Sequence, residues 1–210
     1  MFSNSSFKNQ LGLPRAQSRG FTLVEMITVV AIILIMTAIL LGNLPNFRDK
    51  TSLDLIAQEI AVTIRQAQVF GSGTRTAGDS KFRSYGVYLD SSQIDNFIIF
   101  ADSSDPPNGR YNAVTGGCQT VGTECREQFF LNRGVVITGL EYCSGTCSPY
   151  SGILNITFLR PLTDAYFYDD TALINPQAEY VKINIAKVSK PSDTRSIIIW
   201  GTGHIYVNPT

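Results

Sequence analysis

The chain has 210 residues, which is room for one membrane helix and one soluble domain of ordinary size. Its 17 basic and 17 acidic residues give a formal net charge of zero, and three of the basic ones lie within the first twenty positions. The remainder is therefore mildly acidic, which excludes a general electrostatic drive toward nucleic acid.

An apolar run follows the basic N-terminus. Between Phe21 and Leu44 the only charged side chain is Glu25, and a helix of this length crosses a hydrocarbon layer of about 30 Å. A carboxylate that faces acyl chains costs roughly 2.5–3.5 kcal/mol on insertion scales, so we expect Glu25 to have a functional partner. Residues 1–20 carry no acid, and the positive-inside rule places them in the cytoplasm; their basic side chains are Lys8, Arg15 and Arg19.

A small residue, Gly20, precedes the apolar run, whereas the cleavage site of an ordinary secretory signal follows it. Cleavage after Gly20 would remove residues 1–20 as a leader and leave the helix on the mature protein. The sequence Gly20-Phe21-Thr22-Leu23-Val24-Glu25 resembles the class III leader of type IV pilins and type II secretion pseudopilins. A basic-flanked anchor helix with a chance glutamate is the alternative.

The resemblance implies a membrane peptidase that cuts after Gly20 and then methylates Phe21, the new N-terminal residue. It also implies that Glu25 pairs with the terminal ammonium of a neighbouring subunit once both leave water, which would help to set the filament register. The implied partners are the prepilin peptidase/methyltransferase, other pilin or pseudopilin subunits, and the inner membrane that holds the precursor.

The helix is expected to have two halves, a membrane or filament-core half over 21–45 and an amphipathic half over 46–70. Gly42 and Pro45 mark a locally weakened point of the helix between the two halves, where it would leave the bilayer, because proline removes a hydrogen-bond donor. Gly71-Ser72-Gly73 ends the helix. In the second half, apolar residues recur at three- and four-residue steps and predict one stripe that packs against a sheet. This stripe consists of Leu53, Ile56, Ile60, Ile64 and Ala67.

Residues 71–210, here called the head, change to short β-rich runs with turn residues between them. Val181, Ile183 and Ile185 alternate with other residues as in a half-buried strand, and residues 200–204 predict a tight hairpin. The predicted strands are Phe82–Leu89, Phe97–Ala101, Gln128–Leu131, Val135–Leu140, Ile153–Leu159, Glu179–Val188, Ser196–Trp200 and His204–Tyr206.

These elements predict an α+β fold of the pilin type, a long N-terminal helix packed on a C-terminal β-sheet head. The head is most similar to the H-class minor pseudopilins and related minor pilins. Three segments carry that similarity: residues 57–67, residues 99–110 and residues 195–206. The resemblance implies a structural subunit, not an enzyme, first in the inner membrane with its head outside the cytoplasm and then in a periplasmic or cell-surface filament. A DNA-binding minor pilin for DNA uptake and the major pilin are the alternatives, and pilus and secretion system are both left open.

Four cysteines lie within thirty residues and are candidates for disulfides: Cys118, Cys125, Cys143 and Cys147. Export would allow disulfides to persist. Two local bridges, Cys118–Cys125 and Cys143–Cys147, would each contribute roughly 2–2.5 kcal/mol, although four cysteines allow three connectivities. A zinc site of all four thiolates is a second interpretation, but it usually has tighter spacing, and free thiols are a third.

No cofactor is expected, with calcium as the open alternative at residues 102–109. This segment has two acids but no closing bidentate glutamate, so a solvated loop of turn formers is the preferred interpretation. His204 is the only histidine and has no nucleophile motif beside it, so it is expected to be structural or on the surface. Asp164 and Asp169-Asp170 are interpreted as a solvated loop that also contains residues 166–168, not as a catalytic acid pair.

Basic and aromatic side chains mix near the junction of helix and sheet, a composition that DNA binding would require. Scattered surface charge is the preferred interpretation of this set, which comprises Arg65, Arg75, Lys81, Phe82, Arg83 and Tyr85.

Overall fold

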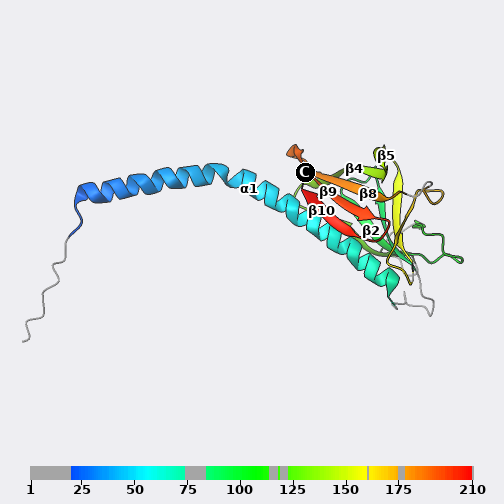
Figure 1. The fold of residues 1–210 in the computed structure, drawn as a ribbon. Helices are drawn as coiled ribbons and strands as arrows, with labels where there is room; N and C mark the ends of the chain where they lie inside the picture. Colours follow the sequence, from blue (N-terminus) through cyan, green and yellow to red (C-terminus); the bar gives the residue numbers. More distant parts are fainter. Residues whose placement is uncertain are drawn as a thin grey trace, which may run out of the picture. The chain divides into compact units, whose positions relative to one another are not determined.

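The computed structural model describes residues 20–73, 84–113, 118, 123–159, 161–174 and 178–209 (Figure 1). The chain divides into two compact units, Met1–Leu44 and Pro45–Thr210. One helix, α1 (Leu23–Ser72), contributes to both.

In the first unit, the described residues form the N-terminal part of α1. The span Leu23–Gly42 is long and apolar enough to cross a membrane, and none of it is buried within the protein. α1 continues without interruption through Gly42 and Pro45, where the sequence predicted a locally weakened point.

In the second unit, the amphipathic stripe of α1 is confirmed. All five of its predicted side chains are buried, as are Ala57 and Ala61 beside them. At Gly71, just before the helix ends, a β-carbon would lie 2.6 Å from the carbonyl oxygen of Phe158, so only glycine allows this close approach of helix and strand.

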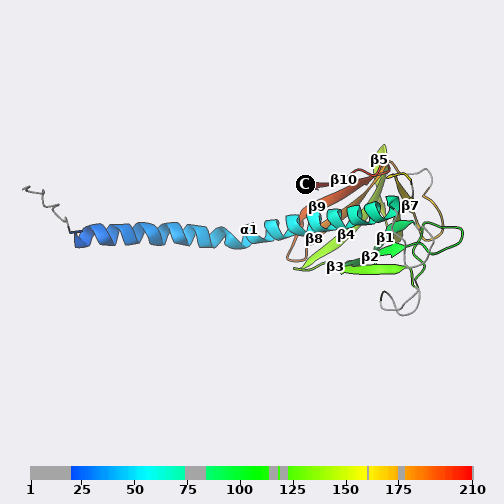
Figure 2. The same cartoon turned by 90° about the horizontal axis from the view of Figure 1, so that it is seen from below.

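The head contains two five-stranded sheets in which every strand pair is antiparallel. The first sheet has the order β3 (Cys125–Phe130), β2 (Asn96–Ala101), β1 (Tyr85–Asp90), β6 (Ile153–Phe158), β7 (Ala165–Tyr168). The second has the order β10 (Ile205–Pro209), β9 (Lys190–Trp200), β8 (Tyr180–Lys187), β4 (Val135–Ser144), β5 (Thr146–Tyr150). In Figure 2 the C-terminal half of α1 lies along the sheets, with β9 and β10 on one side of it and β1, β2 and β3 on the other.

One hydrophobic core joins α1 to both sheets. Its largest fully buried side chains include Leu53 and Ile60 from the helix, Ile156 and Phe158 from the first sheet, and Ile183 from the second. Residues at alternate positions of β8 point into this core, as the sequence predicted, although Ala186 on the other side is buried as well. The α+β architecture is thus confirmed.

Polar contacts also tie α1 to the second sheet and to the segment that precedes β7 of the first. Lys187 pairs with Asp49, and Arg195 pairs with Asp54 at 2.5 Å. Further along, Arg65 donates to the carbonyl of Ile205 at 3.0 Å, and Gln68 Nε2 donates to the carbonyls of Thr163 and Gly203, each at 2.8 Å. These contacts are spread over five turns of the helix, so they fix its position along the sheet as well as its rotation.

Several strand predictions need correction. β5 and β7 were not predicted as strands. β5 follows β4 after the single residue Gly145, whose φ of 75° makes the tight turn, and its short polar residues looked like a loop. β7 has only four residues between acidic segments, and Tyr166, Phe167 and Tyr168 belong to it and not to a loop. The strands that are longer than predicted are β2, β3, β4, β9 and β10. The hairpin at 200–204 is confirmed by the pairing of β9 with β10.

Candidate functional site

At the start of α1, Thr22 and Glu25 bond to each other. The Glu25 N–H donates to Thr22 Oγ1 at 3.3 Å, and Glu25 Oε2 accepts from the Thr22 N–H and hydroxyl, both at 3.4 Å. This is a capping box, in which two orphan N–H groups of the first helical turn are satisfied reciprocally. Sequence reasoning missed it, although the Thr-x-x-Glu spacing before an apolar run was available.

The other hydroxyls of the apolar run bond to their own helix. Thr28 donates to the carbonyl of Glu25 at 2.9 Å, and Thr37 donates to the carbonyl of Ile33 at 2.7 Å. Such back-bonding satisfies hydroxyls in an apolar medium without a partner chain. Glu25 is the only charged side chain between Phe21 and Gly42. Among the described residues, no opposite charge forms an ion pair with it.

A family model described as the prokaryotic N-terminal methylation motif matches residues 15–41. The chain carries a pilin-type methylation motif. The match includes the Gly20–Phe21 bond, the capping box and most of the apolar span. It supports a type IV pilin-like or pseudopilin precursor, which implies processing by prepilin peptidase and assembly with other pilin subunits. Pilin-type proteins that carry this motif are structural subunits.

The match ends at residue 41 and so does not reach the head. Comparison with curated proteins and with solved structures gave no match.

The cysteines form two separate pairs. Cys118 is joined to Cys125 at the start of β3, with 4.8 Å between the two α-carbons. Cys143 of β4 is joined to Cys147, which lies directly opposite it in β5. The first pair is attached to the first sheet through Cys125 and the second pair lies in the second sheet, which is not the arrangement of a zinc site built from four thiolates.

The segment 102–109 differs from the predicted solvated loop because its first acid is buried. Asp102 accepts from the N–H groups of Ser104 at 2.9 Å and Gly109 at 2.7 Å. A second buried acid, Glu124, accepts from the N–H groups of Ser103 at 2.8 Å and Asn112 at 2.6 Å. Glu124 was missed because it comes to this loop from a distant part of the chain. Calcium binding stays an untested alternative here, and both carboxylate oxygens of Asp102 already accept backbone hydrogen bonds.

Two members of the mixed basic and aromatic set, Arg65 and Tyr85, lie in the described residues. Tyr85 is only 2% exposed and packs edge-on against Phe70, so its ring is not available to stack on a base. Arg65 is held by the carbonyl of Ile205. The other members lie outside the described residues; these are Arg75, Lys81, Phe82 and Arg83.

The acids near β7 separate into different environments. Asp169 accepts from the N–H groups of Thr171 and Ala172 at 2.6 and 2.7 Å, and these bonds lower the pKa of its carboxyl below the usual value. Asp164 lies just before β7 and lines a hollow together with Trp200. His204 is exposed, as predicted, with its ring 5.7 Å from that of Tyr206.

The outer face of α1 in the second unit carries a second apolar stripe that sequence reasoning missed. Leu55, Val62 and Val69 are 53%, 65% and 59% exposed. They are seven residues apart, so they lie on one face, opposite the buried stripe. The seven-residue spacing of these three apolar residues is visible in the sequence and would have revealed the stripe.

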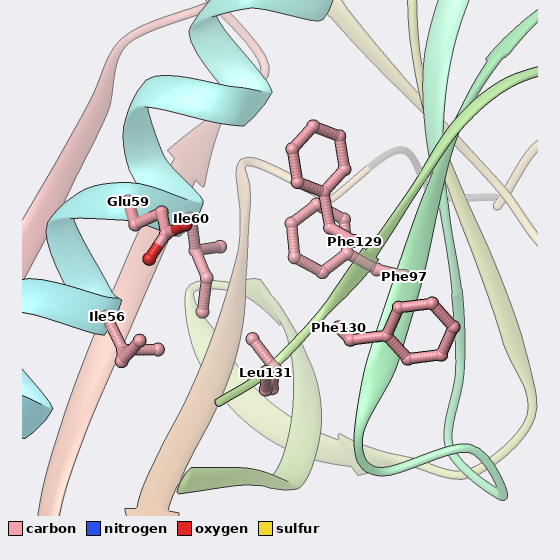
Figure 3. Close-up of a pocket in the computed structure, with 7 residues that line it drawn as sticks. All are labelled: Ile56, Glu59, Ile60, Phe97, Phe129, Phe130 and Leu131. Atoms are coloured by element: carbon pink, nitrogen blue, oxygen red, sulfur yellow. The ribbon is translucent and has the colours of Figure 1, made fainter. Parts of the chain in front are cut away.

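Beside this stripe, a hollow opens between α1 and β3 (Figure 3). Ile56, Glu59 and Ile60 line it from the helix, and the stacked rings of Phe97 and Phe129 line it from the sheet, 5.2 Å apart. Its volume of about 10 Å³ holds at most one water molecule, so it is not a ligand pocket.

Proposed function

We propose that this protein is a minor pilin or pseudopilin of the H-class type, a structural subunit of a type IV pilus or type II secretion filament. The observation that carries the proposal is the methylation motif at residues 15–41, which contains the Gly20–Phe21 bond and Glu25. Maturation consists of cleavage after Gly20 and N-methylation of Phe21. The product is assembled through α1 and has no catalytic role.

Glu25 has two successive partners in this proposal. In the precursor it caps its own helix through Thr22, which holds the carboxylate at the N-terminal end of α1. Cleavage then creates an ammonium at Phe21, and a neighbouring subunit brings such an ammonium to the Glu25 carboxylate. Two opposite charges that leave water together avoid the cost of an isolated buried charge, so the pair favours one axial register.

The outer stripe of α1 extends this assembly surface into the second unit. Leu55, Val62 and Val69 face away from the core, and a neighbouring copy of the chain would cover them. Complete burial of one such side chain contributes roughly 1.5–3 kcal/mol. Three of them at a seven-residue spacing suit a helix that packs alongside another helix.

The H-class assignment rests on the resemblance of residues 57–67, 99–110 and 195–206. The abundance of the chain in sheared filaments would separate a minor subunit from the major pilin. A role in DNA uptake is not proposed, because the described part of the basic and aromatic set has its arginine bonded and its tyrosine buried.

Replacement of Gly20 by leucine tests the proposal. The peptidase needs close access to the bond after residue 20, which glycine allows because it has no side chain. We expect the G20L protein to accumulate as a membrane species heavier by the mass of the leader. A Gly20→Ala control should be processed more efficiently than G20L. Equal mature mass for the native chain and G20L would overturn the proposed cleavage.

A further inference from the structure

A hollow of about 490 Å³ lies in the head where the ends of β7, β8 and β9 meet. Asp164 and Tyr166 line it at the start of β7, Glu179 lines it just before β8, and Trp200 lines it at the end of β9. Its volume falls within the range of small-ligand pockets. No part of the methylation motif or of α1 contributes to it.

Main-chain hydrogen bonds fix the three segments that form the hollow. The Ala165 N–H donates to the carbonyl of Gly201 at 2.9 Å, and the Gly201 N–H donates to the carbonyl of Glu179 at 2.7 Å. The Glu179 N–H in turn donates to the carbonyl of Cys143 in β4 at 2.8 Å. These bonds link the two sheets, so the backbone that carries both acids is held in place before any ligand arrives.

The side chains of the hollow combine unpaired negative charge with aromatic surface. Among the described residues, nothing donates a hydrogen bond to the carboxylate of Asp164 or Glu179, and neither has an ion-pair partner. The described lining residues include no positive charge. The indole of Trp200 packs on Tyr180, with 4.6 Å between the ring centroids, and this contact holds it at the edge of the hollow.

We propose that this hollow binds an arginine side chain presented by another protein. A guanidinium is planar and weakly hydrated, so it stacks on an indole face while its N–H groups bond to carboxylates. A pocket with two unpaired acids and an aromatic wall fits these requirements. A neutral sugar would also stack on the aromatic wall and donate hydroxyl hydrogen bonds to the carboxylates, but it would bring no positive charge to balance the two negative ones. The site is independent of helix-mediated assembly, so this inference goes beyond the proposed function and does not rest on it.

Trp200 is the only tryptophan in the chain, so its fluorescence reports on the hollow directly. The full-length protein in detergent micelles is titrated with N-acetyl-Gly-Arg-Gly-amide and, separately, with the same peptide containing citrulline. Citrulline has nearly the shape of arginine but no charge. We expect a saturable change in emission with the arginine peptide and at least about tenfold weaker binding of the citrulline peptide, since charge-assisted hydrogen bonds are roughly twice as strong as neutral ones.

Two nearly isosteric variants, Asp164→Asn and Glu179→Gln, should each bind the arginine peptide about tenfold more weakly than the native chain does, because each removes one of the two negative charges. Glu127→Gln, which removes an exposed acid from β3 at the opposite edge of the first sheet from β7, is the matched control and should bind as the native chain does. Thermal unfolding of each variant checks that the head remains folded.

Equal affinity for the two peptides overturns the proposal, and this comparison needs only the native chain. The absence of any saturable change with the arginine peptide overturns it as well. If a neutral oligosaccharide such as maltotriose gives a saturable change in Trp200 emission and the arginine peptide gives none, the hollow is a sugar site instead.

Discussion

Replacement of Glu25 by alanine and of Thr22 by valine separates two roles of the Glu25 carboxylate. If Glu25 serves to cap its own helix, the two substitutions should have similar effects, because each removes one half of the capping box. If it serves to pair with a neighbouring subunit, only Glu25→Ala should impair assembly. Valine has nearly the same size as threonine, so T22V is the matched control.

The expected magnitudes differ enough to decide between these roles. Loss of a capping side chain costs about 0.5–2 kcal/mol, which is a factor of roughly 2 to 30 in an equilibrium. Removal of one partner from a buried ion pair costs roughly 3–5 kcal/mol, a factor of about 150 to 5,000, because the other charge is left uncompensated. We therefore expect E25A to reduce recruitment at least several-fold more than T22V.

The assay co-expresses the native chain with each variant and measures the ratio of variant to native peptides in sheared filaments and in the membrane by mass spectrometry. Normalisation to the membrane pool removes differences in insertion and cleavage, which we expect to be small for both variants. Equal recruitment of E25A and T22V would refute the inter-subunit role of Glu25.

Three further outcomes are expected. Val62→Glu, on the exposed stripe of α1, should change the unfolding free energy of the protein by no more than about 0.5 kcal/mol but should lower its recruitment into filaments. The same change at exposed Val188 is the control and should not lower recruitment; equal recruitment of the two variants would remove the stripe from the assembly surface. Ile64→Ala, in the core, should cost about 2–5 kcal/mol in denaturant unfolding, and a loss below about 1 kcal/mol would contradict the packing of α1 on the sheets. The carboxyl of Asp169, followed by NMR, should titrate below pH 3.8 because it accepts hydrogen bonds from Ala172 and Thr171. The stability that the ionised carboxylate contributes at higher pH should be lost as the pH falls through this lowered pKa. Titration at or above pH 3.8 would show that these two hydrogen bonds are not formed.

Local patterns carried the predictions that succeeded. The buried stripe of α1 follows from a 3.6-residue period, and the hairpin after Trp200 follows from two glycines between apolar runs, so neither needs knowledge of the remainder of the chain. The leader depends on a short spacing around Gly20, which the family match at residues 15–41 supports.

Features that depend on distant contacts were not predictable in this way. Asp102 is buried because Gly109 folds back onto it, and Glu124 closes the same loop from across an intervening segment. β7 was missed because its four residues gain their pairing from β6 and not from their own pattern. The hollow at Trp200 is formed by three segments up to 38 positions apart in sequence, which no local spacing reveals.

The central claim is that the chain matures by removal of residues 1–20 and is then built into a filament through its new N-terminus. Mass spectrometry of the protein purified from its native host tests this most directly. The account predicts an N-terminal peptide that begins at N-methylated Phe21. A peptide that begins at Met1, or at an unmodified residue elsewhere in the apolar run, would contradict it.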